Sequence, residues 1–282
     1  MSGRERLTRA VQTVVGRAAR RAGMAAVRAD YNSPLVDPRA LPAELWERNA
    51  PMPGLELNLD RQLRLLEERL EPAIAEFAPA AGFQLDNPWY GPMDAQVLYA
   101  MVRDLKPARV LELGSGYSTL VIQGALSESS RHEVVDPVPS PLLERVADRV
   151  EVHAHSAATL SERKLEALEG GDILFVDTSH AVRPGGEVIR IVLELLPALR
   201  RGVVVHFHDF FRPFEYPRIL YERFNVHWQE QYLLQAFLSY NTNFEVLLSN
   251  HALWRLRRDR VRRLFPELRE GMEPSALWFR RA

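Results

Sequence analysis

Residues 110–119 read V-L-E-L-G-S-G-Y-S-T, and this stretch decides the fold. An apolar, strand-like run ends at Gly114, and a second glycine follows at Gly116. Glycines let a strand turn sharply and let a ligand lie against bare backbone. The carboxylate of Glu112, two residues before the first glycine, restricts the kind of ligand that fits. The stretch therefore predicts a strand, a tight turn and a helix that together bind a cofactor.

Strand-like and helical segments alternate from residue 94 onward. Helical patterns cover 94–105, 187–200 and about 228–239. Strand-like runs lie at 109–113, 132–136, 150–154, 172–177, 202–207, 244–248 and 276–281. This alternation is typical of an α/β fold with a mostly parallel sheet covered on both faces. Ligands of such sheets bind beyond the carboxyl ends of the strands, so residues just after each strand are the candidates for a site.

The composition is that of an ordinary globular protein, with 46% apolar and 26% charged residues. The net charge of -1 predicts no overall attraction to nucleic acid or acidic membranes. The absence of cysteine excludes disulfides and thiolate zinc sites. No apolar run approaches the length of a membrane span, and no secretory signal is visible, so we expect a cytoplasmic protein.

Two classes of cofactor use a Gly-x-Gly turn of this kind. A dinucleotide site has a third glycine where this chain has Thr119, so that the pyrophosphate can rest on the helix N-terminus. S-adenosylmethionine carries no phosphate and needs acidic partners for its ammonium group and ribose. Glu112 meets that need, and Asp136 at the next strand end could hold both ribose hydroxyls. The residues favour S-adenosylmethionine, with an NAD-type dinucleotide-binding oxidoreductase as the alternative.

The chain resembles the class I S-adenosylmethionine-dependent methyltransferases over about residues 80–282. The resemblance lies in their first motif at 110–119, their ribose motif V-V-D-P at 134–137 and their fourth-strand motif D-I-L-F-V-D-T-S-H at 172–180. H-F-H-D-F-F-R-P-F-E-Y-P (206–217) and W-Q-E-Q-Y-L-L-Q-A-F-L (228–238) are similar to a bacterial subgroup acting on small molecules and glycans. The resemblance implies a Rossmann-like seven-stranded sheet of order 3-2-1-4-5-7-6, here with an N-terminal helical extension.

The resemblance also implies cofactor-binding residues. Asp136 would hold the ribose, and Asp177 would lie near the transferable methyl group. The segment N-P-W-Y-G-P-M-D (87–94) resembles one that folds over the cofactor, through Tyr90 and Asp94. The remaining contacts would come from Glu112, Gly114, Ser115, Gly116, Tyr117 and Ser118 on the methionine side, and from Ser156 and Ala157 beside the adenine.

Methyl transfer to a hydroxyl requires an acceptor aligned with the methyl group and a base that removes its proton. His180 follows the fourth strand, and His208 and Asp209 follow the fifth. We expect these three residues to be catalytic, with His208 favoured as the base because Asp209 in the same turn could orient it. His206 points the opposite way in an alternating strand, so we expect it to be structural.

The same residues raise the question of a metal. Some O-methyltransferases hold a divalent ion with carboxylates after these two strands, where Asp177, His208 and Asp209 lie here. The common third ligand, an Asn or Asp, is replaced by Phe210. A divalent metal is therefore not favoured.

Three regions are predicted along the chain: a basic extension with a proline-rich linker at 1–55, a helical segment covering the cofactor at 56–93, and the methyltransferase domain at 94–282. A helix capped by Asp60 should run to about Phe77. Aromatic residues in 210–217 fit either a lid over the acceptor or a packed loop.

The partner that we expect is a small-molecule or glycan acceptor. The first 30 residues hold seven arginines, with Leu7, Val11, Val14 and Val15 at helical spacing. They fit a solvated helix, or a basic helix that touches a membrane surface or a protein. The arginines of 255–263 fit a solvated helix face better than an RNA or phosphate site. Basic segments at both ends leave a non-catalytic, cofactor-binding partner domain as a third interpretation. Neither the acceptor nor the oligomeric state can be read from the sequence.

Overall fold

The computed structural model describes residues 15–19, 21–24, 27, 31 and 33–282. The chain divides into two compact units, Met1–Ala43 with Arg218–His227, and Glu44–Pro217 with Trp228–Ala282. The predicted boundary at 55/56 thus falls inside the second unit. No helix formed by the described residues is long and apolar enough to cross a membrane.

The first unit contains the short helices η1 (Pro38–Ala40) and α10 (Arg218–Glu222), which contact each other. The Asp37 side chain caps η1 by accepting a hydrogen bond from the backbone of Arg39. Residues 15–19 are helical, and Val15 is half exposed. The predicted repeat at Leu7, Val11 and Val14 lies outside the described residues.

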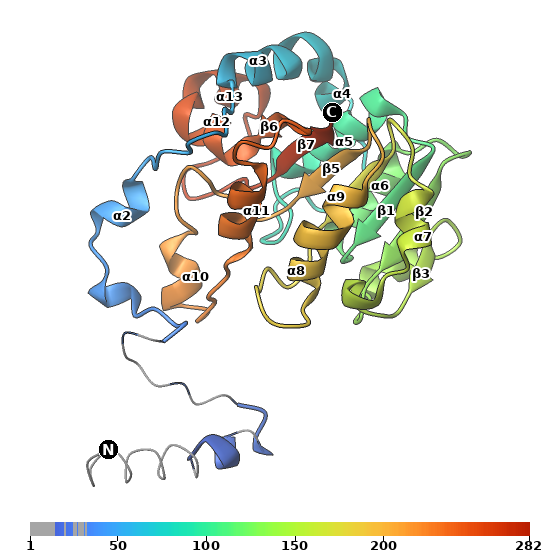
Figure 1. The fold of residues 1–282 in the computed structure, drawn as a ribbon. Helices are drawn as coiled ribbons and strands as arrows, with labels where there is room; N and C mark the ends of the chain where they lie inside the picture. The colour runs from blue at the N-terminus through green and yellow to red at the C-terminus, as the bar shows by residue number, and fades with distance from the viewer. Residues whose placement is uncertain (1–14, 20, 25–26, 28–30, 32) are drawn as a thin grey trace, which may run out of the picture. The chain divides into compact units, whose positions relative to one another are not determined.

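The second unit is built on a seven-stranded sheet (Figure 1) of order β3-β2-β1-β4-β5-β7-β6. The first five strands are parallel, and β7 is antiparallel to both of its neighbours. The predicted fold class and strand order are confirmed, with strand ends shifted by at most two residues. The strands are β1 (Arg109–Leu113), β2 (Arg131–Val135), β3 (Glu151–His153), β4 (Ile173–Val176), β5 (Val204–Phe207), β6 (Phe244–Ser249) and β7 (Leu277–Arg281).

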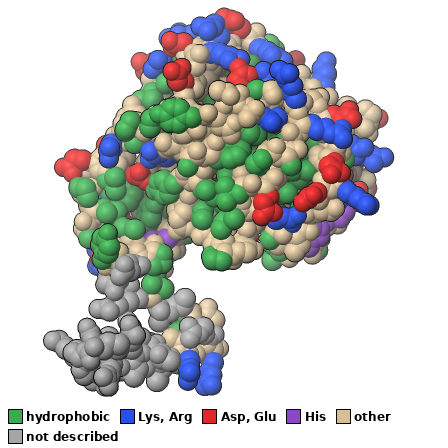
Figure 2. Space-filling view, viewed as in Figure 1, with side chains coloured by type: hydrophobic (Ala, Val, Ile, Leu, Met, Phe, Trp, Pro, Cys, Tyr) green, Lys and Arg blue, Asp and Glu red, His purple; other side chains and the backbone are tan. Residues whose placement is uncertain are grey.

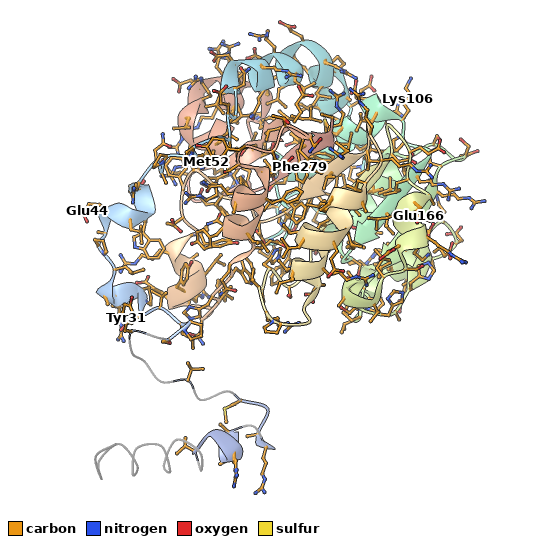
Figure 3. The ribbon with its side chains drawn as sticks, viewed as in Figure 1. Tyr31, Glu44, Met52, Lys106, Glu166 and Phe279 are labelled. Atoms are coloured by element: carbon orange, nitrogen blue, oxygen red, sulfur yellow. The ribbon has the colours of Figure 1, made fainter. Side chains whose placement is uncertain are left out.

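Alternate residues of the strands belong to two separate cores. Val110 and Ile173 face one core, whereas their neighbours Leu111 and Leu174 face the other, as the two-residue period of a strand requires. The central strands are apolar and buried on both faces, which is the pattern of a parallel sheet covered by helices. Figure 3 draws the side chains that fill these layers, Phe279 of β7 among them.

The first core lies under α3 (Leu59–Arg64), η2 (Leu65–Leu70), α4 (Glu71–Ala75), α5 (Asp94–Leu105), α6 (Tyr117–Ala125), α12 (Asn250–Leu256) and α13 (Arg258–Leu264). The second lies under η5 (Ile191–Leu195), α9 (Leu196–Ala198) and α11 (Glu230–Leu238), which are on the near side of the sheet in Figure 1. Helix α8 (Glu187–Arg190) precedes η5 directly. Shorter helices complete the unit: α2 (Glu44–Glu47), η3 (Pro141–Val146), η4 (Ala157–Thr159) and α7 (Glu162–Glu166).

Two predicted helices are interrupted by wider, π-helical turns. The stretches η2 and η5 come just before Pro72 and Pro197. Proline lacks an N–H and its ring collides with the carbonyl four residues earlier, and a wider turn relieves that collision. The predicted cap Asp60 is wrong: Asn58 occupies the N-cap position of α3, and Asp60 lies within its first turn.

Four of the six arginines in the segment 255–263 are paired with acidic residues of the protein. Figure 2 shows acidic and basic side chains interspersed over α3, α12 and α13. The ion pairs are Arg255 with Glu47, Arg257 with Asp60, Arg258 with Glu270 and Arg260 with Glu67. This pattern fits the solvated helix face that the sequence favours over a phosphate or RNA site.

The turn after β1 generates the first prediction. Gly114 has φ +98°, and a Cβ there would lie 1.9 Å from the backbone oxygen of Asp177. Gly171 has a similar φ of +94° but no atom within 4 Å of that position. We expect Gly171→Ala to lower the free energy of unfolding by about 1–2 kcal/mol through backbone strain alone. Gly114→Ala should cost about 2 kcal/mol more, because backbone must move.

Urea unfolding of the two variants and the parent tests this difference. Equal losses for Gly114→Ala and Gly171→Ala would contradict the close approach at Asp177.

Candidate functional site

The glycine turn, residues 114–116, is held between the ends of three strands. Gly114 N donates to the backbone oxygen of Val135 at 3.0 Å, and Asp177 N donates to that of Leu113 at 2.8 Å. These bonds continue the sheet past its regular ends. They bring the turn after β1 against the turn after β4, which begins with Asp177.

A cavity of about 380 Å³ opens beside the glycine turn. Its lining contains six of the predicted cofactor residues: Tyr90, Ser115, Gly116, Tyr117, Ser118 and Asp177. Three lining residues were missed by the sequence reasoning: Trp89, Ser140 and Leu142. Trp89 lies in the quoted segment 87–94, and Ser140 follows the ribose motif, so proximity to those motifs was the available signal.

Asp136 does not line the cavity, but it accepts a hydrogen bond from Ser115, which does. Its Oδ2 accepts from Ser115 Oγ, and its Oδ1 accepts from the backbone N–H of Val138 at 2.8 Å. Ser115 Oγ in turn accepts from Ser140 N at 2.9 Å. The carboxylate of Asp136, predicted to hold the ribose, is therefore linked to Ser115 directly and to Ser140 through Ser115. These bonds fix its orientation.

Besides Asp136 and Asp94, four predicted cofactor residues do not line this cavity. The carboxylate of Glu112 is fully buried and accepts from Ser118 Oγ at 2.6 Å, with His132 Nε2 at 2.9 Å from its other oxygen. Glu112 thus fixes the first turn of α6 through its hydrogen bond with Ser118. Gly114 forms the turn itself. Ser156 caps η4, and Ala157 is buried in the second core.

Two histidines and three carboxylates meet where β4 and β5 end. The carboxylate–histidine cluster consists of Asp177, His180, His208, Asp209 and Glu230. His180 Nε2 lies 3.3 Å from both Asp177 Oδ1 and Asp209 Oδ2. His208 Nδ1 lies 3.6 Å from Asp209 Oδ2 and 3.7 Å from Asp177 Oδ2. The sequence prediction that these strand-end residues converge agrees with this placement.

The backbone at this cluster is in the left-handed region at two non-glycine residues, His180 (φ 56°) and Asp209 (φ 59°). Such conformations cost about 1–3 kcal/mol each and are concentrated at functional sites. In these two strained turns the side chains of His180 and Asp209 face each other.

The electrostatics of the cluster are set by burial and by the carboxylates. Burial by itself lowers the pKa of His208, but Asp209 and Asp177 outweigh it and raise the pKa well above 6.5. Burial also opposes the charge of His180, and Glu230, Asp177 and Asp209 raise its pKa well above 6.5 in the same way. Burial raises the pKa of Asp209, yet His208 and His180 bring it down to about 2.

His206 fits the expected structural role. It is fully buried, and burial holds its pKa well below 6.5. Its ring stacks on Phe175 with centroids 4.1 Å apart, and its Nε2 lies 3.2 Å from the hydroxyl of Tyr90. The Tyr90 hydroxyl therefore points into the core.

The aromatic segment 210–217 fits the packed-loop interpretation. Four of its rings are buried: Phe210, Phe211, Phe214 and Tyr216. The segment is joined to α11 through Gln231, whose side-chain oxygen accepts from Phe211 N and whose backbone N–H donates to the Tyr216 hydroxyl. A lid would need to leave these contacts.

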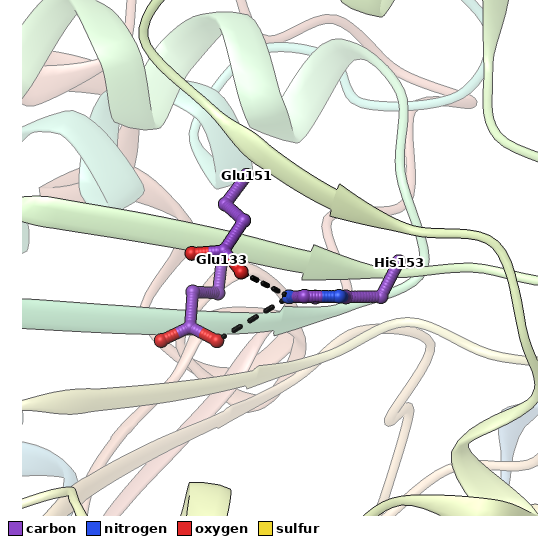
Figure 4. A group of neighbouring side chains, drawn as sticks. All are labelled: Glu133, Glu151 and His153. Atoms are coloured by element: carbon purple, nitrogen blue, oxygen red, sulfur yellow. Dashed lines mark ion pairs between the residues drawn. The ribbon is translucent and has the colours of Figure 1, made fainter.

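Two groups of side chains in the described part of the chain have metal-ligand spacing. In one, Glu133, Glu151 and His153 converge at the edge of the sheet (Figure 4). Lys164 already provides a cation there, bonded to Glu133 and 2.9 Å from His153 Nε2. The other group is Asp177, His180 and Asp209, whose potential ligand atoms lie within 4.8 Å of one another.

The metal set considered from the sequence included His208, which does not belong to either group. Phe210, at the position of the missing oxygen ligand, is buried in the second core. Asp177, His180 and Asp209 could supply three ligands to a divalent ion.

Residues 111–210 match the family model described as a methyltransferase domain. The matched segment runs from β1 to just after β5, and it contains the glycine turn and all of the cluster except Glu230. The predicted resemblance to class I methyltransferases is confirmed for this segment and for the strand order. No curated protein matches the chain.

Solved structures similar to the chain include two O-methyltransferases. One is the O-methyltransferase TomG from Streptomyces achromogenes, in complex with SAM (15% identity, 81% of this chain and 91% of that chain, TM-score 0.46). The other is an O-methyltransferase from Bacillus cereus, in complex with SAH (18% identity, 77% and 90%, TM-score 0.44). Both TM-scores lie below 0.5.

The raised pKa values of His180 and His208 predict how stability depends on pH. A histidine whose pKa is higher in the folded state contributes its full stability below about pH 6.5 and loses it as pH rises through the folded-state pKa. Asp209 has the opposite sign: its contribution is present above about pH 4 and is lost as pH falls toward 2. The free energy of unfolding should therefore decline as the pH rises above about 6.5.

Urea unfolding across about pH 6–9 measures this decline. His208→Gln should make it shallower, whereas His155→Gln, outside the cluster, should keep the parental slope. A His208→Gln variant with the parental slope would show that His208 gains no proton affinity on folding.

Proposed function

We propose that the protein is an S-adenosylmethionine-dependent methyltransferase that methylates a hydroxyl of a small molecule or glycan. The observation that supports this proposal most is that the matched segment and the candidate site overlap along the chain. The segment that matches a methyltransferase domain carries the glycine turn, the strand-end histidines and all of the cavity lining except Trp89 and Tyr90. A cofactor in the cavity and an acceptor at the cluster would meet at Asp177, which belongs to both.

The local bonding at the turn disfavours the dinucleotide alternative. Thr119 Oγ1 accepts a hydrogen bond from Gly116 N at 3.1 Å, so this donor at the start of α6 is already used within the protein. A pyrophosphate needs such donors free. The lining of the cavity includes the carboxylate of Asp177 and, among the described residues, no lysine or arginine.

The non-catalytic alternative loses one of its arguments. Four of the six arginines in the basic segment near the C-terminus are paired with acidic residues of the same unit, as for Arg255 with Glu47. These four do not need an acidic partner protein.

The charge of the cluster favours a cationic ligand. Asp177, Asp209 and Glu230 carry three carboxylates against two histidines, so the cluster is not positive even when both imidazoles are protonated. Asp94, 3.5 Å from His208 Nε2, adds a fourth carboxylate. A buried excess of negative charge stabilises a cation such as a sulfonium. The cofactor supplies a methyl group on that sulfonium, open to in-line displacement.

Residues of the chain would bind the cofactor and remove the proton of the acceptor. Asp136 would hold the ribose, and the glycine turn would let the methionine portion lie against backbone. Asp177 would stabilise the positive charge near the methyl group. His180 and His208 are the candidates for removing the proton of the acceptor, assisted by Asp209.

The contacts of the two histidines favour His180 as the base, although the sequence favours His208. Both ring nitrogens of His208 face acids or Ser275 at 3.4 Å or more. His180 has one nitrogen bonded at 2.8 Å to Glu230, and its other nitrogen faces Asp177 and Asp209. That is the arrangement in which a carboxylate fixes the tautomer of a base.

Cofactor binding gives the first test of this function. Calorimetry should detect binding of S-adenosylmethionine, and Asp136→Ala should weaken it by about 1.5–3 kcal/mol, the scale of a hydrogen bond to a charged group. Asp148→Ala, which removes an exposed carboxylate of the same region, should bind like the parent. If the parent binds NAD and neither S-adenosylmethionine nor its demethylated product, the oxidoreductase alternative is correct.

Proton removal gives the second test. With methyl-labelled S-adenosylmethionine and a hydroxyl acceptor found in a screen of phenols and glycosides, loss of the base should slow transfer about 100- to 10,000-fold. We expect this for His180→Ala, with cofactor affinity within a few-fold of the parent, and a smaller loss for Asp209→Asn. The larger loss for His208→Ala instead would assign the base to His208. EDTA inhibition reversed by magnesium would show that Asp177, His180 and Asp209 act as metal ligands.

A further inference from the structure

The start of α11 and the two residues before it, Trp228 and Gln229, hold His180 in three ways. The backbone oxygen of His180 accepts from Gln229 N at 3.1 Å and from Glu230 N at 3.2 Å. The ring of Trp228 lies against the imidazole, with centroids 4.4 Å apart. His180 Nδ1 donates to Glu230 Oε2 at 2.8 Å, the shortest contact that either histidine of the cluster makes with an acid.

The bond to Glu230 determines which nitrogen of His180 is available. With Nδ1 donating to a carboxylate, Nε2 is the nitrogen left toward the space between Asp177 and Asp209. A rotation of the ring that lost the Glu230 bond would also move Nε2 out of that space. The orientation of the imidazole therefore depends on a residue 50 positions further along the chain.

Stability alone does not explain a carboxylate at position 230. Glu230 is 2% exposed, and its Oε1 has no hydrogen-bond partner among the described residues. A buried carboxylate oxygen without a partner costs free energy, whereas an apolar side chain of similar size would fill the position without that cost. Glu230 is not part of the cavity lining, so its charge is not explained by a direct contact with the cofactor.

We propose that Glu230 is a positioning residue that acts through His180, holding the imidazole by Nδ1 so that Nε2 faces the reacting groups between Asp177 and Asp209. This inference rests on the proposed methyltransferase function. Outer carboxylates that orient a functional histidine typically contribute about 10- to 100-fold to activity.

A double-mutant cycle tests whether Glu230 acts through His180. Glu230→Gln keeps the size of the side chain and an acceptor oxygen but removes the charge. We expect it to lower kcat about 10- to 100-fold, with KM and the Kd for S-adenosylmethionine within a few-fold. In a His180→Gln background, Glu230→Gln should change kcat by less than about 3-fold.

The matched control is the same change in a His208→Gln background, where the full loss, about 10- to 100-fold, should remain. Losses that multiply fully in both backgrounds would show that Glu230 only supports the fold, and a parental kcat in Glu230→Gln would also overturn the proposal. If Glu230→Gln does not fold by circular dichroism, Glu230→Asp, which keeps the charge but shortens the reach, takes its place under the same criteria.

Nitrogen-15 histidine NMR gives a readout that needs no turnover. The His180 Nδ1–H should resonate downfield as a hydrogen-bonded proton in the parent and move upfield in Glu230→Gln, while the His208 signals stay in place. An unchanged His180 signal would overturn the proposal. A parent that shows the downfield signal but neither binds S-adenosylmethionine nor transfers its methyl group would contradict the proposed function instead.

Discussion

The contact between two backbones at the ends of β1 and β4 is the constraint on which the site depends. A side chain at position 114 would lie 1.9 Å from the carbonyl oxygen of Asp177, so this approach needs a glycine. The hydrogen bond from Asp177 N to Leu113 extends the pairing of the two strands beyond their last regular residues. As a result, the turn that would receive a cofactor and the turn that carries His180 cannot move independently. The cavity and the cluster share Asp177 for the same reason.

Charge is the second organising feature. Carboxylates outnumber histidines where β4 and β5 end, and all of these groups except Asp177 are largely removed from water. The charged neighbours outweigh the opposing effect of burial, so the pKa values of the histidines rise and that of Asp209 falls. The excess of negative charge favours a bound cation and disfavours a phosphate. A bound sulfonium would lower the pKa values of the nearby imidazoles and so favour the neutral form that a base requires.

Helix α11 links parts of the molecule that are remote in sequence. Gln231 joins it to the aromatic segment 210–217, and Glu230, one residue earlier, joins it to His180. Adjacent residues of one helical turn therefore fix both the packed loop and the imidazole. A charge and an amide begin the helix, whose remaining residues are apolar or aromatic except for Gln235. These polar positions were visible in the sequence, but their contacts depend on what lies opposite.

The sequence by itself determined the strands, their order through the family resemblance, and the strand-end residues that converge. These depend on local patterns: apolar runs of strand length, glycines at 114 and 116, and polar residues placed just after strands. It could not place Asn58 rather than Asp60 at the cap of α3, because the choice depends on where the preceding chain turns. Only the tertiary structure decided which atoms meet. Glu112 contacts His132, Trp89 lines the cavity, and Glu230 is paired with His180. Each of these contacts joins segments separated by many residues, and their geometry is fixed by the packing of whole elements rather than by local pattern.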